Sequence, residues 1–228
     1  MSFIIFISPS KTFAATNIEG TSQPLFLEKT LKLHEKLQSL TQEDLAKLMS
    51  LSPKLAEITH QYYQIPTMAR AIDLYSGVSY KAMDSQTFTV GNHKLYILDA
   101  YYGLIRPHDY IRAYRLDFTM RFMGNLYDYW QRDIAKYLHK VHHNDILVDL
   151  CSHEFSPLLA EQVNVIRIDF VLKDKKISNV LLKQMRGKMA RYLVDHNIND
   201  VFSLKSVALE GFTYCLDQSN EKTFIFIR

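Results

Sequence analysis

The segment Lys94–Arg115, KLYILDAYYGLIRPHDYIRAYR, decides the fold expected for this chain of 228 residues. Its first part, Leu95–Leu98, is typical of a β-strand, because Leu, Ile and Tyr side chains suit a half-buried pleated surface. Gly103 breaks the strand, and Pro107 disfavours helical dihedral angles at Arg106, so the sequence predicts a turn or loop directly afterwards. Loops at the carboxyl ends of strands carry the binding sites of open α/β sheets.

Charged side chains are concentrated in this predicted loop. It contains Arg106, His108 and Asp109, and the segment closes with a second pair of cations, Arg112 and Arg115. One interpretation is a binding site for an anion. The alternative is an ordinary structural turn whose arginines are solvated or ion-paired, since charged surface side chains need no function.

Two continuous apolar runs, Phe3–Ile7 and Ile146–Leu150, are typical of strands buried on both faces of a sheet. Further strands are predicted at residues 87–90, 163–172, 177–181, 207–216 and 223–227, with a charged hairpin turn at 173–176. Helices are predicted at residues 25–40, 41–49, 53–63, 68–75, 125–140 and 183–196. The pattern predicts a single α/β domain over residues 1–228, with α+β as the alternative, in which helices flank a mixed central sheet.

The composition is that of an ordinary globular protein, with 47% hydrophobic and 22% charged residues. A net charge of +3 is mild, so a polyanionic partner fits the sequence only if the cations cluster. Cys151 and Cys215 are expected to be reduced and buried, because isolated cysteines without a secretion signal are seldom paired. Neither a signal peptide nor a run of about 20 apolar residues is recognisable, which predicts a cytosolic protein without a membrane partner.

Polar groups follow two of the predicted strands. Small hydroxyls and a cation follow the first strand, at Ser8, Ser10, Lys11 and Thr12. This group can hold an anion, although the glycines and the Gly-Lys-Ser/Thr order of a P-loop are missing. A plain strand-exit turn is the alternative. The second polar group, Cys151–Phe155, includes Glu154 but has no strong zinc spacing and no recognisable activating partner for its thiol.

The junction Leu48–Ala56 is similar to a helix-hairpin-helix module, in which free amides and a helix N-terminus grip a DNA phosphate. Its apolar positions, Pro53 and Lys54 align with the pattern Leu-Pro-Gly-Ile-Gly-Pro-Lys-Thr-Ala, but serines replace both glycines. Because serine tolerates positive φ poorly, a simple αα-hairpin is the alternative. Thr41 and Asp44 predict a capping box at the start of the preceding helix.

The predicted helix at residues 183–196 has a basic face that includes Lys183, Arg186 and Arg191. Gly187, beside Arg186, would let a polyanion backbone approach closely. A solvated basic face is the alternative.

Three histidines at the end of the 125–140 helix, His139, His142 and His143, offer an iron-binding interpretation together with Asp145. Cationic groups are favoured at a helix C-terminus, and this explains the histidines without a metal. The sequence therefore predicts no metal site and no cofactor.

Six short motifs occur in one order along nearly the whole chain: SPSKT at 8–12, YGLIRPHD at 102–109, YRLD at 114–117, YDYW at 127–130, LCSHEF at 150–155 and RGKMARY at 186–192. The chain thereby resembles the YaaA-like peroxide-stress protein family. The resemblance implies a cytosolic α/β domain of unusual topology that is linked to peroxide resistance and to keeping free iron low. It also implies DNA binding through a positively charged cleft and a helix-hairpin-helix element. The chain departs from the family pattern at Ser10, Asp117 and Met185, and is somewhat short before the central strand.

The leading hypothesis is a stress-protective protein that binds DNA without sequence preference. The residues expected to bind DNA or phosphate are Ser8, Lys11, Lys54, Arg106, Arg115, Arg186 and Arg191, and Tyr101 and Tyr102 are expected to stack on unpaired bases. The alternative is an enzyme acting on a nucleotide or damaged nucleic acid, with Asp109, Asp117 or Glu154 as acid or base. A carboxylate of raised pKa in the same pocket as Lys11 and Arg106 would favour the enzyme.

Overall fold

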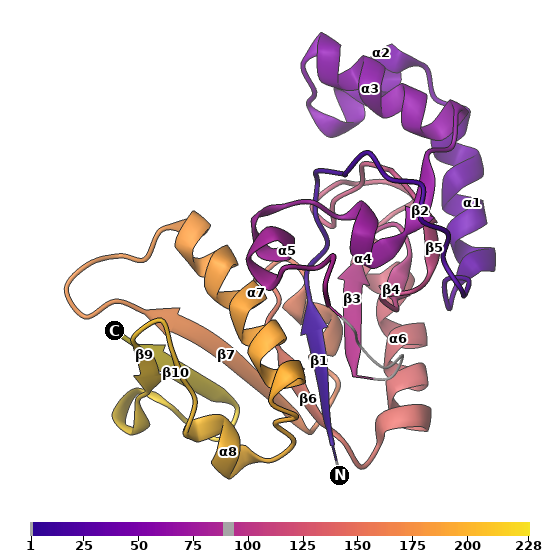
Figure 1. Cartoon of the computed structure of the whole chain (residues 1–228). Helices are drawn as coiled ribbons and strands as arrows, with labels where there is room; N and C mark the ends of the chain where they lie inside the picture. The colour runs from indigo at the N-terminus through magenta and orange to yellow at the C-terminus, as the bar shows by residue number, and fades with distance from the viewer. Residues whose placement is uncertain (1, 89–93) are drawn as a thin grey trace.

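A mixed eight-stranded sheet forms the centre of the computed structural model, which describes residues 2–88 and 94–228 (Figure 1). The strand order is β4-β3-β1-β6-β7-β10-β9-β8. The strands are β1 Phe3–Ile7, β3 Leu95–Asp99, β4 Gly103–Ile105, β6 Ile146–Asp149, β7 Val165–Val171, β8 Ala208–Leu209, β9 Phe212–Tyr214 and β10 Thr223–Ile227. The five strands from β3 to β10 in this order are parallel, and antiparallel pairs extend both edges. The predicted α/β class with a mixed central sheet is confirmed.

Helices surround this sheet and form a projection at one end of the molecule. They are α1 Leu27–Gln38, α2 Gln42–Met49, α3 Pro53–Gln64, α4 Ala71–Leu74, α5 Val78–Met83, α6 Leu126–His142, α7 Asn179–Asp195 and α8 Val201–Lys205. A separate antiparallel pair joins β2, Met68–Arg70, to β5, Tyr110–Arg112. Figure 1 shows α2 and α3 beyond the carboxyl ends of β1 and β3, while α5 and α7 lie close to the sheet. No helix in the described part of the chain is long and apolar enough to cross a membrane.

The central strand β1 is apolar throughout because it is completely buried. All five residues of β1, FIIFI, are buried, as expected for a parallel strand covered on both faces. β1 pairs with β3 on one side and with β6 on the other, and Phe6 lies opposite Asp149. The chain segments that follow β1 and β6 therefore leave the sheet side by side.

The break predicted at Gly103 marks a tight β-hairpin between β3 and β4, not the start of a loop. Gly103 has a φ of +75°, and a Cβ atom there would come within 2.6 Å of the Trp130 ring on α6. Trp130 in turn donates its indole N–H to the Ala100 carbonyl at 2.8 Å. Glycine is thus required both by the backbone conformation and by the close approach of α6.

Three predictions of secondary structure are wrong. Residues 177–181 do not form a strand, because the Ser178 side chain accepts a hydrogen bond from the Leu181 amide and caps α7. Residues 68–75 form β2 and the short α4, since pairing with β5 overrides helical propensity. The strand predicted at 207–216 is divided by a turn at Glu210 and Gly211, which both have positive φ. The strand predicted at 87–90 falls partly outside the described residues.

Candidate anion-binding site

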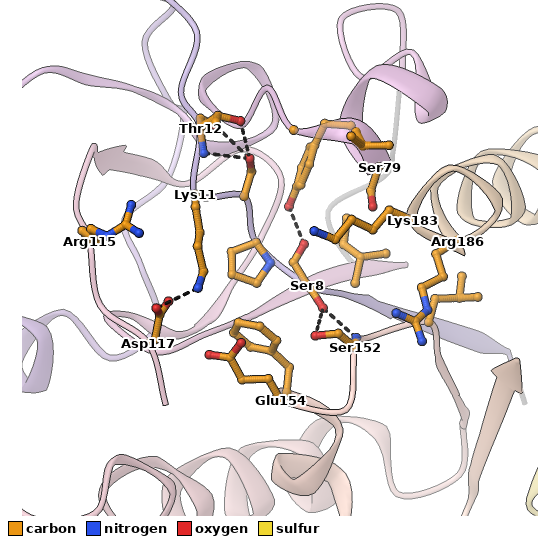
Figure 2. Close-up of a pocket in the computed structure, with 18 of the residues that line it drawn as sticks. Ser8, Lys11, Thr12, Ser79, Arg115, Asp117, Ser152, Glu154, Lys183 and Arg186 are labelled. Atoms are coloured by element: carbon orange, nitrogen blue, oxygen red, sulfur yellow. Dashed lines mark hydrogen bonds and ion pairs between the residues drawn. The ribbon is translucent and has the colours of Figure 1, made fainter. Parts of the chain in front are cut away.

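A pocket of about 300 Å³ opens where the chain leaves β1 and β6 (Figure 2). The carboxyl ends of parallel strands are the usual place for ligand sites in α/β sheets. Its polar lining comes from five segments of the chain: Ser8, Lys11, Thr12, Ser79, Arg115, Asp117, Ser152, Glu154, Lys183 and Arg186. Four of these side chains are cationic and two are carboxylates, so the pocket favours an anion.

Hydrogen bonds tie the two strand exits together at the floor of the pocket. The Ser152 amide donates to Ser8 Oγ at 2.8 Å. The Tyr80 hydroxyl, from α5, donates to the Ser8 carbonyl at 3.1 Å. Three elements that are far apart in the sequence are therefore fixed against each other before any ligand arrives.

Close packing of α5 on α7 determines the position of one wall of the pocket. A Cβ atom at Gly187 would lie only 2.1 Å from the Ser79 carbonyl oxygen. Glycine is thus needed because the α5 backbone occupies the space beside α7. The prediction that a polyanion backbone approaches Gly187 is wrong. The glycine instead brings Ser79 next to Arg186, the residue before it.

Arg186 is a buried cation with an incomplete set of partners. It is 6% exposed, and its only ion pair within residues 2–88 and 94–228, with Asp169, spans 3.4 Å. Its Nε–H has no hydrogen-bond partner among the described residues, and the same holds for the buried Nε–H of Arg115. Burial, which leaves the guanidinium poorly solvated, lowers the pKa of Arg186. A buried donor without a partner is costly, and an anionic ligand would satisfy it.

Beneath the pocket, Arg167 holds the carboxylates that border the end of β6. It bonds to Asp149 at 3.0 Å and to Asp169 at 2.9 Å. Asp169 is thus shared between two arginines, which explains why Arg186 is only weakly paired.

The two carboxylates of the pocket have different environments. Asp117 forms an ion pair with Lys11 at 2.7 Å. Glu154 accepts a hydrogen bond from the Phe118 amide at 3.2 Å. Burial, and then the nearby Asp117 charge, raise the pKa of Glu154 above its usual range. A carboxyl group of this kind can carry a proton at a pH where an ordinary glutamate does not.

The structure brings together Ser8, Lys11, Arg115 and Arg186 from the predicted phosphate-binding set, and Asp117 and Glu154 from the predicted carboxylates. Arg106 and Asp109 do not line this pocket. Asp109 is fully buried and accepts hydrogen bonds from the Arg106 backbone and side chain and from the Ser22 hydroxyl at 2.6 Å. The turn 106–109 is therefore the structural turn given as the alternative.

Arg191 and Lys54 also lie outside the pocket. Arg191 bonds to Asp195 at 2.6 Å and to the Thr87 hydroxyl at 2.9 Å. Lys54 is exposed near the start of α3. One pocket thus contains only part of the cationic set that the sequence predicts.

The expectation that Tyr101 and Tyr102 stack on bases is wrong, because both are buried. Their amides donate to the Asp99 carboxylate at 2.7 and 2.8 Å. Asp99 is itself fully buried at the end of β3 and also accepts hydrogen bonds from the hydroxyls of Tyr75 and Tyr114. These tyrosines belong to the core.

Lys183 and Tyr80 are among the pocket residues that were not in the predicted set of site residues. Lys183 lies one turn before Arg186 on α7, a helical spacing that places both on one face. The helical pattern placed Lys183 on the basic face predicted for this helix, but it did not show that this face lines a pocket. Tyr80 comes from α5, whose six-residue sequence carries no clear helical pattern. Its position depends on the packing of α5 against α7.

The histidine group at the end of α6 has structural partners. His142 is buried and lies within hydrogen-bonding distance of Tyr96 at 3.1 Å and Asp145 at 3.0 Å. No group of three or more metal-ligating side chains occurs in the described residues. Cys151 is free and buried, and burial raises its thiol pKa, the reverse of what activates a nucleophile. Cys215 is also free but only partly buried, so the expectation that it is buried is wrong.

The fold and the pocket define an α/β protein with a cation-rich pocket at the carboxyl edge of its parallel strands. The family model described as "Peroxide stress protein YaaA" matches residues 3–218, and the chain belongs to that family. It is 32% identical to a UPF0246 protein of Desulfitobacterium hafniense, over 98% of this chain and 97% of that protein. It is also 30% identical to UPF0246 proteins of Francisella tularensis, over 99% of this chain and 100% of theirs, and of Caulobacter sp., over 99% and 98%.

Proposed function

We propose that this peroxide-stress family member binds DNA without sequence preference and uses the strand-end pocket to hold a phosphate. The observation that carries this proposal is the cationic excess of the pocket, together with the unpartnered Nε–H groups of Arg115 and Arg186. Such groups match the oxygens of a phosphate. Phosphate contacts carry no base information, so the binding is expected to be sequence-neutral.

The α2–α3 hairpin supplies a second phosphate contact in this proposal. The predicted capping box is present, because Thr41 Oγ accepts from the Asp44 amide at 3.1 Å and the Asp44 carboxylate accepts from the Thr41 amide. Ser50 has a φ of +51° and closes the hairpin despite carrying a side chain. No side chain among the described residues caps the N-terminus of α3, and because Pro53 has no N–H, the amides of Lys54 and Leu55 are the first ones available to an anion.

The test is a salt series with short single-stranded and duplex DNA, read by fluorescence anisotropy. We expect affinity to fall steeply with salt, through counterion release. Arg115→Ala/Arg186→Ala should make the slope shallower by about 1.5 units, because each lost phosphate contact removes about 0.7 to 0.9. Lys188→Ala is the matched control, since Lys188 lies on the same helix outside the pocket and is paired with Glu210. A slope that the double variant leaves unchanged would place the DNA elsewhere.

A second candidate is an enzyme that acts on a nucleotide or on damaged nucleic acid. Glu154 favours it, because a carboxyl group of raised pKa lies in the same pocket as Lys11, although Arg106 is elsewhere. The expected result is turnover of a nucleotide substrate that Glu154→Gln abolishes while ligand binding persists. Binding without any turnover by the wild type would exclude this role.

We further propose a role in keeping free iron low, as the family resemblance implies, and expect it to depend on the strand-end pocket. The measurement is chelatable iron in cells that lack the protein and carry either the wild type or Arg186→Ala. If the wild type and the variant lower chelatable iron equally, the pocket is not needed for the effect on iron.

A further inference from the structure

The pocket has an apolar wall as well as its cations. Pro9, Tyr80, Leu150 and Phe155 line it, and the last three are at most 5% exposed. A phosphate ion alone would fill only part of the pocket of about 300 Å³. Small-molecule sites combine apolar walls with a few oriented polar groups, and about 300 Å³ is at the lower end of their size range. The pocket therefore suits one small organic molecule that carries one anionic group.

The anionic group has a defined place. Figure 2 shows the Lys183 and Arg186 side chains extending from α7 toward the ends of β1 and β6. Lys183 is exposed, no hydrogen bond or ion pair of its side chain occurs among the described residues, and its charge partly offsets the rise in the pKa of Glu154. Arg186 is more than nine-tenths buried and its Nε–H is unpartnered. These two cations, Lys183 at the rim of the pocket and Arg186 inside it, can together hold a phosphate.

The opposite side of the pocket offers hydrogen bonds to a ring edge. The Glu154 carboxyl group accepts one hydrogen bond, from the Phe118 amide, and its second oxygen has no hydrogen bond among the described residues. Lys11 is paired with Asp117. A carboxyl group of this type can pair with the donor and acceptor atoms of a nucleobase edge. The ties between Ser8 and Ser152, and the α5–α7 contact at Gly187, fix these groups in advance.

We infer that the pocket binds a single nucleotide as a unit, with its phosphate on Lys183 and Arg186 and its base between the apolar wall and Glu154. The inference rests on the proposed function, because it takes the ligand from nucleic acid chemistry and specifies what enters the pocket. The nucleotide has two possible sources, a free nucleoside monophosphate or an unpaired nucleotide of a strand.

The experiment is calorimetric titration of the full chain with the nucleoside 5′-monophosphates, ribose 5-phosphate and inorganic phosphate. We expect at least one monophosphate to bind at least tenfold more tightly than ribose 5-phosphate and inorganic phosphate, because only the nucleotide has a base that packs against the apolar wall. Lys183→Ala should weaken that nucleotide about tenfold. Lys183 is exposed, so this variant is expected to fold. Lys188→Ala, on the same helix and paired with Glu210 instead, should bind like the wild type.

Two results would overturn the inference: monophosphates that bind no better than ribose 5-phosphate, or a Lys183→Ala variant with wild-type nucleotide affinity. Displacement of a labelled single strand by the nucleotide would identify the strand as a source, whereas nucleotide binding without displacement would identify the free nucleotide. If nucleotides fail while DNA binding with its pocket-dependent salt slope persists, the inference alone fails. If nucleotides bind and DNA does not, the proposed DNA binding fails and the nucleotide site stands.

Discussion

The turn at Arg106–Asp109 and the pocket around Arg186 are two strand-end sites with the same residue types and opposite outcomes. In the turn, the fully buried Asp109 carboxylate is surrounded by Arg106 and Ser22 donors. In the pocket, cations outnumber carboxylates, and two arginine Nε–H groups have no partner in the part of the chain that the structure describes. A charged strand end is thus a candidate ligand site when its donors remain unsatisfied, and a structural element when they are satisfied.

The largest expected effect breaks the satisfied site. Asp109→Asn removes the charge that Arg106 faces and should lower the free energy of unfolding by about 3 kcal/mol, as for other broken buried ion pairs. Urea unfolding measures this change. Asp117→Asn is the control, because its partner Lys11 is mostly exposed, and should cost less than about 1 kcal/mol. Equal losses of unfolding free energy in the two variants would contradict the distinction between a satisfied structural turn and an unsatisfied pocket.

Gly187→Ala should affect both stability and the pocket. The added methyl group would press on the Ser79 carbonyl and force α5 away from α7, at an expected cost of about 1 to 3 kcal/mol. Anion affinity should fall as well, because Ser79 and Arg186 would separate. Unfolding and titration of the same samples test this prediction, with Lys188→Ala as the control on that helix. An unchanged free energy of unfolding in this variant would mean that α5 moves away from α7 without loss of stability, which would contradict the prediction.

Arg186→Met should separate stability from binding. Asp169, the one ion-pair partner of Arg186 among the described residues, would still be paired with Arg167, so we expect the free energy of unfolding to change by less than about 1 kcal/mol. Ligand affinity should fall at least tenfold, since the buried donor is gone. Thermal unfolding with and without ligand checks both. A large loss of stability would make Arg186 a structural residue like Arg106.

The smallest expected effect is a pH dependence that originates at Glu154. Its pKa is raised in the folded protein by burial and by Asp117, so the folded state binds the proton more readily than the unfolded state. Stability should therefore rise as pH falls from the raised folded pKa toward the usual glutamate value, and then level off. The difference in unfolding free energy between the wild type and Glu154→Gln isolates this contribution. A difference independent of pH would contradict it.

Local sequence determined most of the secondary structure. The continuous apolar run Phe3–Ile7 is a buried strand, the periodic segment that contains Trp130 is an amphipathic helix, and Thr41 with Asp44 forms the capping box. These features depend on neighbours within a few residues, where spacing and side-chain chemistry suffice. The strand predicted at 177–181 failed because the Ser178 cap starts a helix there.

The tertiary structure alone decided which polar groups meet. Every strand offers the same backbone hydrogen bonds, so neither the pairing of β1 with both β3 and β6 nor the position of α7 can be read from local residues. That arrangement joins Lys11, Glu154 and Arg186 in one pocket, although they are far apart in the chain. Arg106 and Asp109, three residues apart, satisfy each other within their own turn. The sequence by itself thus determined which charged groups follow the strands, and long-range packing decided which of them are free to bind a ligand.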